Sequence, residues 1–362
     1  MPSRRQFIAG VLAAGVAPAP GWAEAGRPRY VSAARKPDQT YALIGLTNEA
    51  KIAFDLPLPA RGHAAAAHPH RSEAVMFARR PGIYALVINC VSGVPIVQLD
   101  APPGRHFYGH CAFSGDGTLL FTTENDFDRA VGIVGIWDAT KGYTRIGEFH
   151  SGGVGPHDIR VMPDGVSLVV ANGGIETHPE TGRAKLNLPT MRPNLATLGL
   201  DGAPLALTEL DETLHKNSIR HLATGLDGSV AFAMQWQGDA FEHPPLIGLR
   251  RPDSSVVLLE ADLASQQRMQ GYAGSIAMDD TGRVATTSPR GGLCQVFDTA
   301  SGELTTSVAL TDVCGVALSD TGFAVTTGQG FVSLDVGLTD QALSRFDLQW
   351  DNHLIDIRIP KA

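Results

Sequence analysis

The sequence is poor in lysine and cysteine, and its long apolar run, residues 7–18, lies at the N-terminus. The 362 residues carry a formal net charge of −8 and show no basic patch, so we expect no nucleic-acid partner. None of the four cysteines (Cys90, Cys111, Cys294 and Cys314) has a CxxC spacing, which excludes zinc-ribbon, thioredoxin-like and haem-attachment motifs. The sequence leaves open whether two of these cysteines form a disulfide bond. A glycine-rich phosphate loop and a serine-nucleophile elbow are also absent.

The N-terminus resembles an export signal. Arg4 and Arg5 precede the apolar run, and small residues around Ala23 and Ala25 offer a cleavage site. We predict a twin-arginine signal peptide over residues 1–25 and a single mature domain over residues 26–362, located in the periplasm. The apolar run is too short to span a bilayer, so we expect no stable membrane insertion of the mature chain. The alternative is a buried N-terminal helix.

The mature chain repeats one phrase: an apolar strand, a tight turn of the Asp-Gly or Thr-Gly type, and a second apolar strand. Glycine suits such turns because it adopts positive φ. Two further short strands follow in the clearest copies. Repeats begin near residues 64, 111, 158, 222, 275 and 315, with a seventh shared between the two ends of the chain. Four antiparallel strands per repeat at this spacing are typical of a propeller blade.

We therefore predict an all-β fold, a seven-bladed β-propeller with four-stranded antiparallel blades, with six or eight blades as alternatives. The last strand, residues 354–358, is expected to pair with N-terminal strands at residues 41–45 and 51–54. Such pairing would close the ring and remove the exposed edge of an open array. An insertion beginning at Glu176 and running to Asn194 is rich in Pro and Asn, and is a candidate lid or partner-binding loop over the channel.

Histidines recur at one position of the repeat, where the inner strand begins. His110, His157 and His221 occupy it clearly, and His63 and His353 less securely. A structural interpretation is that these polar residues cap the channel and bind neighbouring backbone. The alternatives are a site for an anionic or organic ligand and, as we prefer, a transition metal centre, because imidazole suits iron, copper and zinc. Metal–nitrogen bonds are about 2 Å long, so a subset on adjacent blades is expected to bind one ion.

Neighbouring residues add to this site. His106 precedes His110 by four residues and is a further candidate ligand, and Tyr108 between them can donate a hydrogen bond. Asp158 adjoins His157 and can orient a metal-binding imidazole. Arg220 carries a fixed charge that favours an anion nearby. Cys314 is a soft ligand if reduced, although a buried apolar role is at least as good an interpretation.

Several segments together resemble the family named domain of unknown function 1513 (DUF1513). They are Arg61-Gly62-His63, residues 73–82, Gly109-His110-Cys111-Ala112-Phe113-Ser114, Glu124-Asn125-Asp126 and Gly155-Pro156-His157. The resemblance covers essentially the whole mature chain. It implies an exported propeller encoded beside imelysin-type iron-uptake lipoproteins and dihaem-peroxidase-like proteins, and so a role in iron or other metal acquisition. It supplies no catalytic residues.

The functional hypothesis is a periplasmic iron- or copper-binding propeller that serves as a carrier or accessory factor for iron-uptake proteins. One alternative is an oxidoreductase with its metal at the propeller axis, which requires an open coordination position. The other is a metal-free scaffold that docks the lipoprotein partner through its loops. The sequence does not decide whether the protein is an enzyme, and it identifies no catalytic residues.

Overall fold

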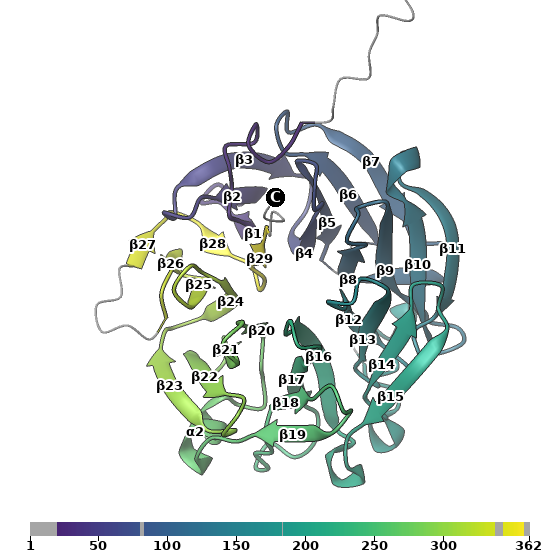
Figure 1. Ribbon diagram of the computed structural model, residues 1–362, viewed down its shortest axis with the longest axis vertical. Helices are drawn as coiled ribbons and strands as arrows, with labels where there is room; N and C mark the ends of the chain where they lie inside the picture. Colours follow the sequence, from purple (N-terminus) through teal and green to yellow (C-terminus); the bar gives the residue numbers. More distant parts are fainter. Residues whose placement is uncertain (1–19, 80–82, 183, 337–342, 358–362) are drawn as a thin grey trace, which may run out of the picture.

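The computed structural model describes residues 20–79, 83–182, 184–336 and 343–357. Seven antiparallel sheets stand around a central channel, which confirms the seven-bladed propeller with four-stranded blades (Figure 1). Inner strands begin near the positions that the repeats predict. From inner to outer strand, the first three complete blades are β4 (Gly62–Ala67), β5 (Glu73–Ala78), β6 (Tyr84–Asn89), β7 (Pro95–Asp100); β8 (Arg105–Phe113), β9 (Leu119–Asp126), β10 (Val131–Asp138), β11 (Thr144–His150); and β12 (Pro156–Val161), β13 (Ser167–Asn172), β14 (Asn194–Gly199), β15 (Pro204–Glu209).

Three more blades follow in the same order along the chain. They are β16 (Asn217–Thr224), β17 (Val230–Trp236), β18 (Ile247–Arg250), β19 (Val256–Leu259); β20 (Ser275–Met278), β21 (Arg283–Ser288), β22 (Leu293–Asp298), β23 (Leu304–Ala309); and β24 (Val313–Leu318), β25 (Phe323–Thr327), β26 (Phe331–Ser333), β27 (Leu343–Arg345). The described helices are short: α2 (Leu263–Arg268) and the 3-10 turns η1 (Ala139–Lys141), η2 (Pro179–Thr181), η3 (Leu188–Thr190) and η4 (Glu212–Leu214). Among described residues, no helix reaches the length and apolarity needed to cross a membrane.

The seventh blade joins the two ends of the chain. Its sheet contains β1 (Tyr30–Arg35), β2 (Tyr41–Leu46) and β3 (Ile52–Leu58), and its inner strand is made of two short pieces, β28 (Gln349–Trp350) and β29 (Ile355–Asp356). Both pieces pair with β1. The predicted pairing with residues 41–45 and 51–54 is therefore wrong, because β1, which lacks the repeated turn phrase, lies between them. The closure itself is present, with purple and yellow strands side by side (Figure 1).

Turn glycines fix the connection between the first two strands of several blades. Gly117, Gly165, Gly228 and Gly282 have φ of 73°, 71°, 86° and 84°. This is the left-handed region that other residues resist. The preceding aspartate closes the turn, as where Asp116 Oδ1 accepts a hydrogen bond from the Thr118 amide at 3.0 Å. The repeated phrase thus sets the strand register in each of these blades.

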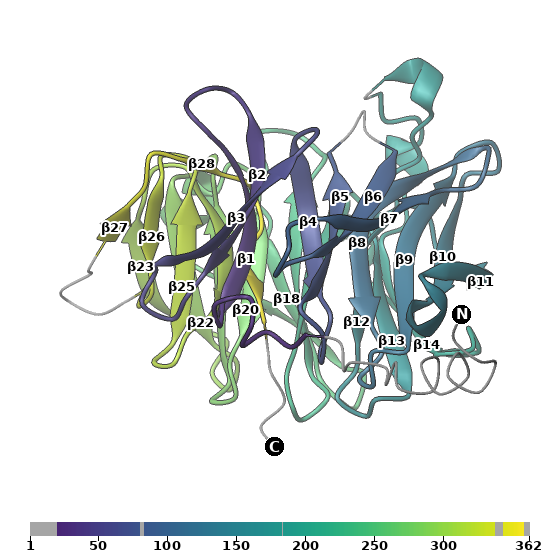
Figure 2. The same ribbon diagram turned by 90° about the horizontal axis from the view of Figure 1, so that it is seen from above.

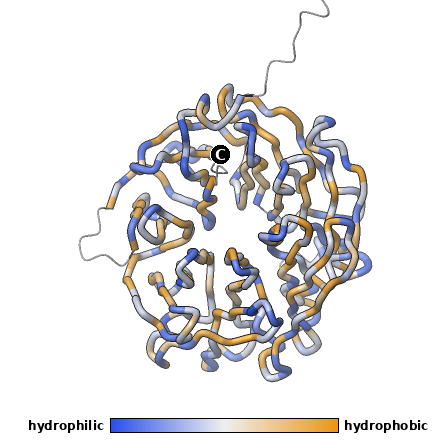
Figure 3. Tube along the Cα trace, in the orientation of Figure 1, coloured by the Kyte–Doolittle hydropathy of each residue, from blue (hydrophilic) through white to orange (hydrophobic). Residues whose placement is uncertain are grey.

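The hydrophobic core lies between the faces of adjacent blades and runs around the ring. Fully buried aromatic residues from different blades mark it: Phe77, Phe121, Phe232, Phe297 and Phe323. Hydrophobic segments accordingly recur around the whole ring (Figure 3). Since burial of apolar surface is the main driving force of folding, every blade depends on both of its neighbours.

Part of the segment assigned to the signal peptide packs on this ring. Trp22 is buried and donates a hydrogen bond from Nε1 to the His68 carbonyl at 2.9 Å. Ala25 is buried in the same cluster. Residues 1–19, which hold the paired arginines, lie outside the described residues, so the export signal stays a prediction.

Candidate functional site

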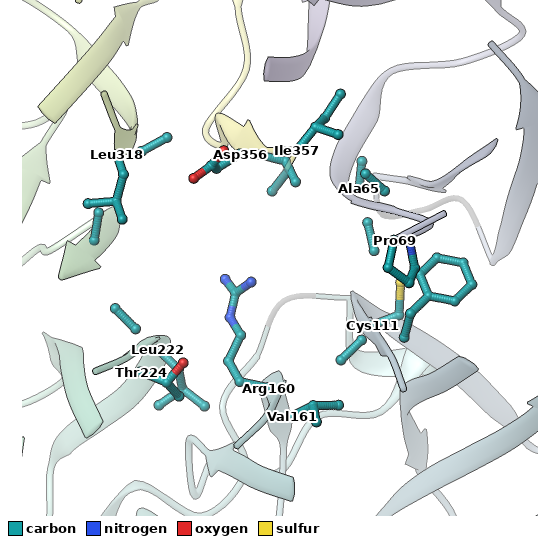
Figure 4. A pocket seen from close by; sticks show the side chains of 18 of the residues that line it. Ala65, Pro69, Cys111, Arg160, Val161, Leu222, Thr224, Leu318, Asp356 and Ile357 are labelled. Atoms are coloured by element: carbon teal, nitrogen blue, oxygen red, sulfur yellow. The ribbon is translucent and has the colours of Figure 1, made fainter. Parts of the chain in front are cut away.

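Inner strands of all seven blades line the central channel. Beyond the histidine positions they enclose a chamber of about 350 Å³, which we call the apolar chamber. Its wall is mainly alanine, valine, leucine and isoleucine, and the Arg160 side chain projects into it, with Asp356 on the opposite wall (Figure 4). Asp356 is held by Arg29 at 3.1 Å. Besides Arg160 and Asp356, the polar side chains in its described lining are His68, Ser114 and Thr224.

Local irregularities of the inner strands aim the histidines at the axis. The pairing register shifts between Gly62 and Ala65, between Phe107 and Cys111, between Pro156 and Asp158, and between Ile219 and His221. A β-bulge turns the side chains beside it, and each of these shifts encloses or adjoins a predicted histidine. His353 lies between β28 and β29, where the inner strand of its blade is interrupted.

One glycine makes room for this arrangement. Gly109 has φ of 100°, and a Cβ at this position would lie 2.5 Å from Cδ2 of His63. A residue other than glycine would therefore be strained and would collide with the imidazole of the preceding blade.

Five imidazoles from five blades gather at the axis. We call this set the axial histidine cluster: His63, His110, His157, His221 and His353. His110 lies closest to the others, with ring centroids 4.8 Å from His353, 4.9 Å from His157, 5.2 Å from His63 and 5.5 Å from His221. Around it, neighbouring centroids are 4.8 to 6.2 Å apart. The repeat position identified in the sequence therefore becomes one compact cluster.

Two groups of three nitrogens within the cluster have spacing suited to a metal ion. In His63, His110 and His157, and again in His110, His221 and His353, one nitrogen per residue lies within 4.8 Å of the other two. His110 belongs to both groups. The second group is fully buried, whereas His63 and His157 are half-buried. The first group therefore offers an ion an approach from outside.

Hydrogen bonding leaves several of these nitrogens unused. His110 Nε2, His157 Nδ1, His221 Nδ1 and His353 Nε2 are buried and have no hydrogen-bond partner among the described residues. Burial and the neighbouring positive groups lower the pKa of His157, His221 and His353 well below the ordinary 6.5, so these rings are neutral. Neutral imidazoles with an open lone pair are the form that binds transition metals.

Asp158 supports the cluster from behind, although not through its sequence neighbour His157. Its Oδ1 lies 3.3 Å from Nδ1 of His110 in the preceding blade. It also accepts hydrogen bonds from the Leu222 and Ile159 amides at 3.0 and 2.8 Å, and pairs with Arg160 at 3.3 Å. Burial raises the pKa of this carboxyl, but the Arg160 charge and the contact with His110 hold it far below its usual value. The contact leaves His110 Nε2 pointing away from Asp158.

On the other side of the cluster lies a second pocket of about 270 Å³, which we call the vestibule. Its described lining is His63, Arg79, Tyr108, His157, Ile175, Thr177, Lys185, Arg220, His221, Gln235, Tyr272 and Asn352. Thr177 and Lys185 come from the insertion predicted as a lid, which stands at the ends of the strands (Figure 2). The cluster thus separates the polar vestibule from the apolar chamber.

Two sequence candidates stay outside the cluster. His106 stacks on Phe127 with centroids 5.9 Å apart, and it belongs to neither described group of three. Cys314 is buried, and its Sγ contacts the Asp312 carbonyl at 3.2 Å. All four cysteines are free thiols, so the disulfide considered from the sequence is absent.

The other candidates border the cluster. Tyr108 and Arg220 line the vestibule, and the charge of Arg220 contributes to the low pKa of His157 and His221. Sequence reasoning missed Lys185, Tyr272 and Gln235. Lys185 alone carried a signal, since it lies in the insertion already identified as a candidate lid.

Fold and site together define a seven-bladed β-propeller with a polyhistidine cluster on its axis. The chain belongs to the DUF1513 family, described as a protein of unknown function, whose model matches residues 56–357. No curated protein matches the chain. Among solved structures it is similar to Kuenenia stuttgartiensis hydrazine synthase, with a TM-score of 0.60 and 13% identity over 91% of this chain and 97% of that one. At this identity the likeness shows the fold alone.

Proposed function

We propose that this protein binds one transition metal ion, iron or copper, through the axial histidine cluster, as a periplasmic carrier or accessory factor in iron uptake. The observation that carries the proposal is the set of four buried imidazole nitrogens without hydrogen-bond partners among the described residues. Leaving buried polar atoms unpaired is costly, so such a concentration needs a compensating ligand. A metal ion is one ligand that engages several imidazole lone pairs at once.

The group His63, His110 and His157 is the best candidate for the ion. Its three nitrogens lie within 4.8 Å of one another. A tetrahedral ion with bonds of about 2.1 Å needs nitrogens about 3.4 Å apart, which small side-chain rotations supply. His63 and His157 face the vestibule, so an ion here keeps a position open to that side. Reversible loading requires such access.

The resemblance to exported propellers encoded beside imelysin-type lipoproteins supports the carrier role. A metal oxidoreductase is the second candidate, favoured by the vestibule next to His63 and His157, where a substrate has room beside the ion. A carrier releases its ion intact, whereas an oxidoreductase turns over substrate with the ion retained. A metal-free docking scaffold is the third alternative, in which changes to the cluster alter stability and nothing else.

Metal content tests the proposal directly. We would purify the exported protein without a histidine tag, measure bound metal by mass spectrometry, and repeat the measurement for His110→Ala and His157→Ala. We expect about one ion per chain in the wild type, and a loss of affinity of about 100-fold or more in His110→Ala, because His110 belongs to both groups. His215→Ala, in a half-buried position outside the cluster, is the matched control. A wild-type protein that stays metal-free after reloading with iron, copper or zinc contradicts the proposal.

A further inference from the structure

The vestibule is positively charged although the chain as a whole is acidic, with a formal net charge of −8. Its described lining includes Arg79, Lys185 and Arg220, and no described lining residue is an aspartate or glutamate. Arg79 is paired with Asp351 at 2.9 Å. Lys185 contacts a neutral partner, the side-chain oxygen of Gln237. Lys185 thus keeps its charge beside a neutral partner, and Arg220 is a second cationic group in the lining.

These cations lie close enough to one another to interact. Burial lowers the pKa of Lys185, and the charges of Arg220 and Arg290 lower it further. The Arg290 guanidinium lies 4.5 Å from the ring centre of Tyr272, which lines the same pocket. Cations gathered in this way raise each other's energy, and an anion between them relieves the repulsion.

A metal ion in the axial cluster adds to this positive potential. Imidazole ligands are neutral, so the three proposed ligands, His63, His110 and His157, offset none of the ion's charge. The nearby carboxylate, Asp158, is already engaged by Arg160 and His110. The described lining of the vestibule holds no carboxylate, so an ion bound by His63, His110 and His157 would add its charge to those of Lys185 and Arg220. An anion in the vestibule would contact both the ion and these two cations.

The pocket also has the size and the hydrogen-bonding groups for a carboxylate. Tyr108, Thr177, Gln235, Tyr272 and Asn352 add hydroxyl and amide groups to the cationic wall. A volume of 270 Å³ corresponds to about nine water molecules at about 30 Å³ each, enough for a small dicarboxylate or tricarboxylate. Arginine binds carboxylates with two parallel hydrogen bonds, and lysine adds a point charge.

We propose that the vestibule binds a small polycarboxylate that contacts Lys185 and Arg220 and completes the coordination of the ion held by His63, His110 and His157. This inference rests on the proposed function, and it specifies the form of the cargo: the metal enters as an anionic carboxylate complex. Lys185 makes the insertion over residues 176–194 a specificity element. The insertion thus recognises the anion while the blades bind the ion.

Calorimetric titration with malonate, a dicarboxylate, tests the inference on the whole exported protein. We expect malonate to bind the metal-free protein and to bind the metal-loaded protein at least tenfold more tightly. Lys185→Gln and Arg220→Gln are each expected to weaken binding at least tenfold in both states. Lys141→Gln removes an exposed lysine elsewhere and should leave malonate affinity unchanged. Metal content measured after each titration shows whether malonate has removed the ion.

The outcomes separate this inference from the proposed function. If the wild type binds one ion per chain but no malonate, or if Lys185→Gln and Arg220→Gln bind malonate like the wild type, the inference is overturned and the metal site stands. If the protein binds malonate through Lys185 but takes up no metal, the proposed function fails and the role of the anion as a metal ligand fails with it. Lys185→Gln changes a surface insertion, so its result does not depend on how Arg220→Gln folds.

Discussion

Five blades place a histidine at the axis and two do not, and the two kinds differ in how their polar groups are satisfied. The blades of β20–β23 and β24–β27 lack the histidine. There Ser275 Oγ accepts a hydrogen bond from the Val316 amide at 3.4 Å, and the Gly315 amide donates to Thr326 Oγ1 at 3.2 Å. In the histidine blades, imidazole nitrogens stay without hydrogen-bond partners among the described residues. At the axial position, the two blades without histidine thus hold polar groups that bond one another, whereas four of the histidine blades hold a buried imidazole nitrogen without a described partner.

The two kinds of blade also differ in the space available for a side chain at the axial position. A Cβ on Gly315 would lie 2.5 Å from the Leu354 amide nitrogen, so the blade of β24 has no room for a side chain at its axial position. Four of the histidine blades have a register shift beside the histidine. The β24 blade also has one, between Val313 and Val316, but it places a glycine where the others place an imidazole. If the histidines merely capped the channel, their imidazole nitrogens should have hydrogen-bond partners in all five histidine blades.

The largest expected effect that separates the two sides is a pH dependence of stability in the metal-free protein. His157, His221 and His353 stay neutral when folded, whereas in the unfolded chain they take up protons near pH 6.5. Stability is therefore complete above pH 6.5 and is lost as the pH falls below it, by about 1 kcal/mol per pH unit for each histidine that stays neutral in the folded protein. Urea unfolding between pH 7.5 and 5 measures the slope.

Two controls assign this slope to the axial cluster. Burial also lowers the pKa of His68, to about 4, so His68→Asn removes its contribution from the same pH window. Bound metal should raise the stability wherever the ion stays bound but keep the slope, because coordinated imidazoles stay unprotonated in the folded protein while the unfolded chain still takes up protons. A metal-free protein with constant stability from pH 7.5 to 5 would show that the three rings take up protons in the folded protein as they do in the unfolded chain, against the proposal.

A second prediction concerns the carboxylate behind the cluster. Asp158→Asn keeps the shape but removes the charge that faces His110 Nδ1. We expect metal affinity to fall 10- to 100-fold, the usual cost of losing a carboxylate that orients a metal-binding histidine. Competition against a coloured chelator measures it, and Asp227→Asn, on the β16–β17 turn, is the control. If the metal affinity of Asp158→Asn equals that of the wild type, Asp158 contributes to folding but not to metal binding.

The sequence predicted the fold and the five cluster residues because both repeat with the blade. The turn phrase recurs with its Asp-Gly signal, and a histidine at a fixed distance before it must lie at the same level of the channel in every blade. The same reasoning does not apply to His106, which we predicted as a further metal ligand. It precedes His110 by four residues, but the register shift in β8 separates the two side chains, and such shifts carry no sequence signature.

The repeat pattern could predict neither the lining of the vestibule nor the strand that closes the ring. Lys185 reaches the channel through an irregular insertion whose path is not set by strand periodicity, and Asp158 contacts His110 across a blade boundary. β1 lacks the turn phrase and was recognised only from its pairing with β2, β28 and β29. Contacts between blades follow from packing, which the spacing of one blade does not encode.

A third prediction addresses the blades without histidine. Gly315→Ala places a methyl group against the Leu354 backbone and Thr326, and we expect a loss of about 1–3 kcal/mol in the free energy of unfolding from overpacking. The collision reaches Leu354, next to His353, but not the three ligands that we propose for the ion. Metal affinity of the folded protein should therefore stay within about threefold, because His63, His110 and His157 form a group without His353. Urea unfolding and chelator competition on the same sample give both values. A large loss of metal affinity in a stably folded variant would mean that the two sides of the channel are coupled.

The smallest effect is expected at Cys314, the residue that the sequence left open as a soft ligand. Burial raises the pKa of its thiol, and its Sγ contacts the Asp312 carbonyl at 3.2 Å, so the reactive thiolate is disfavoured where it stands. Cys314→Ala should change metal affinity less than about twofold and cost about 1 kcal/mol of stability for the small cavity. Cobalt loading offers a sensitive check, because a thiolate ligand adds a charge-transfer band that imidazole ligands do not. If the wild type shows such a band and the variant does not, Cys314 is a metal ligand. The metal site would then include a sixth blade, and the distinction between the two sides of the channel would not hold.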